Sequence, residues 1–174
     1  MQVSLDTVDW SQLTAFSDAT AFLDWYFDLE DESELGGESC YKNGWESDSA
    51  IQYFEVAGML ANLAAIASPP YSEHLTQGLL RLISEAGHVD EFEMSEPSEG
   101  CYWISACPAT TREIKHHVDA IDIEECFRLL TEHPTAGVQF GPDQRDMFAS
   151  VVRQHIKMVD LAVDKDHGLL GHCG

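Results

Sequence analysis

The sequence predicts a mainly α-helical protein: a compact bundle or array of five or six helices, with a small β-hairpin possible near residues 89–107. Apolar residues recur at helical spacing through most of the chain, and proline and glycine separate the periodic segments. The 174 residues include 44% hydrophobic ones, enough for one core without metals or disulfides. We therefore expect residues 1–174 to form a single acidic helical domain.

The first predicted helix covers residues 17–31. Its apolar side chains repeat at i, i+3, i+4 and i+7, and they are Phe22, Trp25, Tyr26 and Leu29. Aspartates recur on another face of the same helix, at Asp24, Asp28 and Asp31. Residues 31–47 are rich in turn-forming and acidic residues, which predicts a long loop.

Two further helices follow. The segment 48–67 is apolar around almost its whole circumference, which is typical of a helix at the buried centre of a domain, and Pro69-Pro70 should end it. A helix over 72–86 is predicted next, with Gly87 as its C-terminal cap.

The second half of the chain begins with short segments at 89–94 and 101–107 that suggest β structure. Possible capping boxes at Thr110 with Glu113 and at Asp122 with Glu125 predict one helix or two short ones over 111–132. The last helix should begin near Pro142 and end near Lys165.

Charge is the most unusual property of the sequence. The net charge is −22, and the first hundred residues hold 20 acidic residues against two basic ones. So strong a negative field disfavours direct binding to nucleic acids or to anionic membranes. It favours a cationic protein as the partner.

The acid-rich ridge and loop are the predicted partner-binding site. Carboxylates would steer and dock a basic protein, with two aromatic side chains as anchors. The residues are Asp24, Asp28, Asp31, Glu32, Glu34, Glu38, Tyr41, Trp45, Glu46 and Asp48. Two alternatives remain open: a solvated face that only confers solubility, and a row of carboxylates that mimics a nucleic-acid backbone.

No catalytic motif is present. The five cysteines form no Cys-x-x-Cys pair, and Cys107 and Cys126 lack a local catalytic context. The sequence shows neither a secretory signal nor a membrane-spanning stretch, so we expect a reducing, cytoplasmic setting. These observations predict a protein that is not an enzyme and needs no cofactor.

A metal-dependent or hydrolytic enzyme is the alternative. Glu85 with His88 and Glu113 with His116 have the Glu-x-x-His spacing of di-iron bundles, and Glu55 is expected on the buried helix. Residues 167–173 are expected to be a frayed tail, in which His167 or His172 would bind zinc only by chance. His155 is expected to be a core or boundary histidine rather than a metal ligand.

These observations together predict an inhibitor or immunity protein of the antitoxin type. It would neutralise a basic protein, such as a toxin or nuclease, by covering its functional surface.

Overall fold

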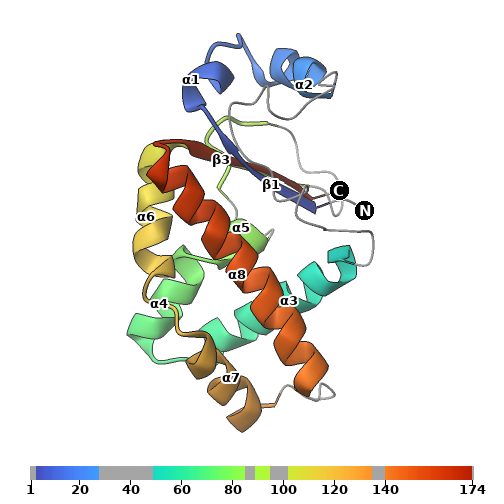
Figure 1. Cartoon of the computed structure of the whole chain (residues 1–174), viewed down its shortest axis with the longest axis vertical. Coiled ribbons are helices and arrows are strands. Elements are labelled where there is room, and N and C mark those ends of the chain that lie inside the picture. Colours follow the sequence, from blue (N-terminus) through green and yellow to red (C-terminus); the bar gives the residue numbers. More distant parts are fainter. Residues whose placement is uncertain (1–2, 28–48, 85–88, 95–101, 135–139, 174) are drawn as a thin grey trace.

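The structure, a computed structural model, describes residues 3–27, 49–84, 89–94, 102–134 and 140–173. The protein is mainly α-helical with a small sheet, as the sequence predicts. Its elements form three layers, with the short helices α1 (Trp10–Leu13) and α2 (Ala19–Phe27) above the sheet and the longer helices below it (Figure 1).

The sheet joins the two ends of the described chain. Its strands are β1 (Val3–Val8), β2 (Tyr102–Ala106) and β3 (Gly168–Cys173), in the order β1-β3-β2. Both outer strands run antiparallel to β3, which pairs Gly168 with Val8 and Leu169 with Ala106. The expectation of a frayed tail at 167–173 is wrong, because 168–173 is the central strand.

Alternation along the strands divides the apolar side chains between two cores. One set packs against the long helices and comprises Leu5, Ile104, Ala106 and Leu169. The other set packs under α1 and α2 and comprises Val8, Trp103 and Leu170. The sheet is therefore covered on both faces, and each face has its own hydrophobic cluster.

Helix α3 (Ser49–Ile66) matches the predicted helix over 48–67, but it is not buried all round. Tyr53 and Leu60 lie in the core, whereas Phe54, Glu55 and Asn62 are exposed. The difference arises because its helical neighbours, α4, α5, α7 and α8, leave one of its faces open.

The predicted helix over 72–86 is two helices, α4 (Pro69–Gln77) and α5 (Leu80–Ile83). Gly78 separates them, where a Cβ would lie 2.7 Å from the His74 carbonyl oxygen and 3.1 Å from Val118 Cγ2. Pro69 starts α4 after the cap residue Ser68, so the proline pair both follows one helix and opens the next. Gly87 lies outside the described residues.

The segment 111–132 forms two helices, as one of the alternatives predicts: α6 (Pro108–Val118) and α7 (Ile123–Glu132). The Asp122 side chain caps α7 by accepting from the Glu124 N–H at 2.9 Å. The Thr110 capping box is wrong, because α6 already begins at Pro108 and Thr110 is buried. Helix α8 (Pro142–Asp164) ends within one residue of its predicted end.

Part of the β structure expected near 89–107 is present as β2, but it does not form a hairpin with residues 89–94. Its ladder partner is β3, and residues 89–94 add an isolated parallel bridge from Asp90 to Ser105. Among the described helices, none combines the length and the apolar character needed to cross a membrane.

Candidate functional site

A groove of about 500 Å³ opens on the α1–α2 layer. It is lined by Gln12, Ala15, Phe16 and Trp25. Phe16 and Trp25 are half-buried, and their ring centroids lie 5.1 Å apart with the planes tilted by 38°. The groove therefore has two aromatic side chains among its four lining residues and one polar group, the Gln12 amide.

Buried aromatic packing holds these two rings in place. Phe22 is fully buried and contacts Phe16 edge-on, with ring centroids 5.4 Å apart, and Trp25 at 5.6 Å. Phe92 meets the other side of Phe22 at 5.8 Å. Edge-to-face and tilted pairs of this kind add to the burial energy, so the groove is built on a rigid support.

Helix α1 is fixed to the sheet by a close approach. A Cβ at Gly168 would lie 2.4 Å from Cε3 of Trp10, so only glycine lets the indole pack this closely against β3. Asp9 caps the helix by accepting from the Ser11 N–H at 3.0 Å and the Ser11 hydroxyl at 2.7 Å. The direction of α1, and thus one wall of the groove, follows from these contacts.

Two carboxylates of this layer are held in the charged form. The Ser11 hydrogen bonds lower the pKa of Asp9. Asp18 accepts from the Ala21 N–H at 2.9 Å at the start of α2, and this bond lowers its pKa. Both acids are therefore ionised across the physiological range.

The layer carries charge of one sign. Residues 3–27 contain four aspartates and no lysine, arginine or histidine. Asp6 is buried in β1, whereas Asp18 and Asp24 are exposed. The aromatic groove is thus lined by a segment, residues 3–27, whose charged side chains are all aspartates.

Only one residue of the predicted partner-binding site lies in the described part of the chain. Asp24 is exposed on α2, as predicted for the acidic ridge. The other nine lie outside the described residues: Asp28, Asp31, Glu32, Glu34, Glu38, Tyr41, Trp45, Glu46 and Asp48. Trp25, predicted as part of the core stripe, also lines the groove.

Comparisons with protein-family models, curated proteins and solved structures found no match. A function for the chain therefore rests on its own geometry and charge.

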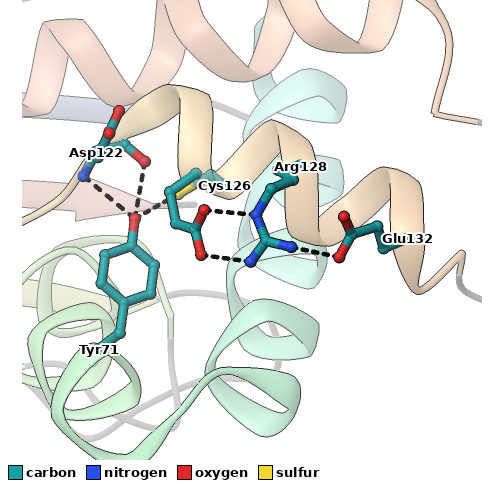
Figure 2. Close-up of polar contacts among 6 residues, drawn as sticks. Tyr71, Asp122, Cys126, Arg128 and Glu132 are labelled. Carbon is teal, nitrogen blue, oxygen red and sulfur yellow. Dashed lines mark hydrogen bonds and ion pairs between the residues drawn. The ribbon is translucent and has the colours of Figure 1, made fainter.

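Cys126 does not have the surroundings of a nucleophile. Figure 2 shows the Tyr71 hydroxyl at the start of α7, where it donates to the Asp122 carbonyl at 2.8 Å and contacts Cys126 Sγ at 3.2 Å. Burial raises the pKa of the Cys126 thiol to about 11. A thiol protonated at neutral pH is a structural group, and this contact joins α4 to α7.

Arg128 on α7 pairs within its own helix (Figure 2). Its guanidinium binds Glu125 at 2.7 Å and also contacts Glu132. Glu125 therefore pairs with Arg128 instead of closing the predicted capping box with Asp122. These pairs are exposed, so each contributes little to stability.

The residues proposed for a metal site do not converge. Glu55 is exposed, which contradicts its expected place facing a buried centre. Glu113 and His116 both lie at the surface of α6, and Glu85 and His88 fall outside the described residues. Across the described ranges no three histidine, cysteine or acidic side chains are placed to share a metal ion.

His155 is a core histidine, as predicted. It is 2% exposed, and its Nδ1 lies 2.9 Å from the Val151 carbonyl oxygen. Burial lowers its pKa to about 4, so the ring is neutral at physiological pH. His172 packs against Trp103, with ring centroids 4.5 Å apart, rather than in a group of metal ligands.

Proposed function

We propose that this chain is a non-enzymatic binding protein that neutralises a basic protein, such as a toxin or nuclease, as an inhibitor or immunity protein does. One observation carries the proposal. The groove lined by Phe16 and Trp25 opens in a layer whose only charged side chains are aspartates.

The groove suits a basic side chain. Lysine and arginine have an apolar stem that packs on aromatic rings and a charged head that interacts favourably with a ring face. The exposed carboxylates of Asp18 and Asp24 lie in the same layer and supply the opposite charge. Aromatic anchors and acids together give both affinity and orientation, which acids alone would not.

The whole-chain charge supports the same partner. A net charge of −22 attracts a cationic protein at long range and accelerates its association, most strongly at low salt. It also repels nucleic acids and anionic surfaces. An inhibitor benefits from fast association, because it must reach its target before the target acts.

The first test is capture from a lysate of the source cell on immobilised wild-type protein and, in parallel, on the Trp25→Ala variant. Only a basic protein retained by the wild type and lost from the variant counts as a partner. Its binding kinetics are then measured against matched pairs of variants: Trp25→Ala with Phe54→Ala, and Asp24→Lys with Glu55→Lys. Phe54 and Glu55 are exposed on α3, away from the groove.

Trp25→Ala should weaken binding at least about 30-fold, the size of an interface hot spot, while Phe54→Ala should leave it nearly unchanged. Asp24→Lys should slow association about threefold or more at low salt, and the effect should shrink as salt rises. Equal slowing by Glu55→Lys would mean that net charge acts without a docking site, and this would overturn the proposal.

Competition with a DNA duplex tests the alternative that the carboxylates of this chain mimic a nucleic-acid backbone. A partner that DNA displaces from this chain is bound through its nucleic-acid groove. A partner that DNA does not displace is covered at another surface.

A further inference from the structure

A second pocket, of about 390 Å³, lies where α4, α5 and α6 meet. Its lining comprises Gln77, Arg81, Arg112, Glu113, His116 and His117. The four residues from α6 lie at i, i+1, i+4 and i+5, so one helical face supplies most of the wall. The helices that line this pocket lie below the sheet, whereas α1 and α2, which line the aromatic groove, lie above it (Figure 1).

This pocket concentrates groups that donate hydrogen bonds and carry positive charge. Arg81 and Arg112 are two of only nine lysines and arginines in a chain with a net charge of −22. Within the described residues, Arg81 forms no ion pair with a carboxylate. Arg112 binds Asp166, and both of these side chains are exposed.

Three histidines meet beside the arginines. His74 Nδ1 lies 3.2 Å from His117 Nδ1, and the ring of His116 lies 5.4 Å from that of His117. One ring of the His74–His117 pair must donate and the other accept, so the accepting ring carries its proton on Nε2. A proton added to the pair binds Nε2 of the donor ring. Both rings then carry a proton on Nε2, and the hydrogen bond between the two Nδ1 atoms is kept.

We propose that this pocket binds a small oxyanion of the phosphate class, held by Arg81, Arg112 and the His116–His117 edge of α6. The guanidinium groups match the geometry of phosphate oxygens and bind them with charge-assisted hydrogen bonds. A volume of about 390 Å³ exceeds what a bare phosphate fills and falls within the usual range for small-molecule sites. The pocket thus has room for a phosphate monoester.

Proton uptake should accompany binding. Burial, followed by the neighbouring His74 and His116, lowers the pKa of His117, and an anion in the pocket would raise it again. The pKa of His117 should therefore be higher with the anion bound than without it. Glu73 on α4 raises the pKa of His117, whereas Arg81 on α5 and His116 on α6 lower it. Arg112 and Glu113 on α6 are the other charged groups that line the pocket.

A divalent metal is the competing ligand. Two nitrogen ligands of tetrahedral zinc lie roughly 3.3 Å apart, close to the His74–His117 separation of 3.2 Å. Against zinc, two arginines line the adjoining pocket, and the described residues supply no third ligand placed to complete the site. The positive charges of the two arginines attract an oxyanion and repel a cation, so they favour the oxyanion.

The test is an NMR titration of the histidine ring signals in the full chain, with inorganic phosphate, glycerol phosphate and zinc chloride as separate probes. Saturable shifts of His116 and His117 with phosphate and a raised His117 pKa are the expected results. Tighter binding of glycerol phosphate would assign a monoester as the ligand, and equal affinity would assign free phosphate.

Charge variants give effects of opposite sign. Arg81→Gln should weaken phosphate binding about fivefold or more. Asp166→Asn frees Arg112 for the ligand and should strengthen binding about twofold to threefold, and asparagine tolerates the positive φ of 56° at this position. Arg153→Gln on α8, outside the pocket, should leave phosphate binding unchanged.

Three outcomes would overturn the proposal. They are the absence of saturable shifts at millimolar phosphate, equal weakening by Arg81→Gln and Arg153→Gln, and saturable binding of zinc at His74 and His117 without any phosphate response. None of them bears on binding of a basic protein at the aromatic groove, so the two proposals fail independently.

Discussion

The α1–α2 layer and the helical body beneath the sheet differ in charge and in the contacts that hold them. The layer has aspartates as its only charged residues, and the side-chain hydrogen bonds described within residues 9–21 span four residues or fewer. The body contains the described arginines and most of the described histidines, and its polar contacts join distant helices, such as Tyr71 to Asp122. One small sheet thus separates two surfaces suited to ligands of opposite charge.

The layer depends on aromatic packing, so removing its centre should have the largest effect on stability. Phe22→Ala should lower the free energy of unfolding by about 3–5 kcal/mol, because Phe22 is fully buried between Phe16, Trp25 and Phe92. Urea unfolding followed by tryptophan fluorescence and by far-UV circular dichroism measures the change.

The same experiment shows how independent the two regions are. Coincident transitions would mean that the layer and the body unfold as one unit through the sheet. An early fluorescence transition would show that the layer opens first. The control Phe54→Ala, on the open face of α3, should cost less than about 1 kcal/mol. A similar loss in both variants would contradict the central role of Phe22.

Acid should destabilise the body, because His155 is buried in its core. Buried His155 has a pKa of about 4, below its ordinary value of 6.5, so the unfolded chain binds the additional proton between these pH values. The free energy of unfolding should therefore fall as the pH drops from about 6.5 toward 4, by up to about 3 kcal/mol.

Denaturant unfolding between pH 7.0 and 5.0 measures this slope. His155→Gln should lower stability at pH 7.0 and flatten the dependence on pH. The exposed His133→Gln serves as the matched control and should keep the wild-type slope. An unchanged slope in His155→Gln would place the titration elsewhere.

The smallest of these effects concerns the polar contacts of the body. Tyr71→Phe removes the hydroxyl that joins α4 to α7 and should cost about 1 kcal/mol, the usual worth of such a bond. Thr76→Val is the control: the Thr76 hydroxyl donates only to the Ser72 carbonyl of the same helix, and its loss should cost less than about 0.5 kcal/mol. If Tyr71→Phe and Thr76→Val lowered the free energy of unfolding equally, the contact between α4 and α7 would contribute no more than a bond within one helix. The proposed difference between the body and the layer would then be wrong.

Local signals in the sequence were sufficient for the long helices. Helix α8 begins at the predicted Pro142, and Asp122 caps α7 as expected, because caps and apolar repeats act within a few residues. The open face of α3 was not predictable in this way. An apolar helix surface is buried only if a neighbouring element covers it, and the sequence of α3 does not specify its neighbours.

Contacts between residues far apart in the sequence explain the features that local patterns did not predict. Gly78 separates α4 from α5 at a point where Val118 of α6 approaches the backbone. Phe16 lines the groove only because α1 and α2 fold over the sheet. Helix α1 is four residues long, too short to show a period. The Asp9 cap was the one local signal that pointed to it. In the second pocket, His74 and His117 are 43 residues apart and meet only in three dimensions.

The central position of β3 affects the order in which the protein assembles during synthesis. Neither β1 nor β2 has its ladder partner until residues 168–173 leave the ribosome, although β1 is made first. Helices α3, α4 and α5 can begin to pack earlier because each of them contacts the other two. The α1–α2 layer must wait for the sheet that supports it. The region that we propose binds a basic partner is therefore made before the helical body and completed after it.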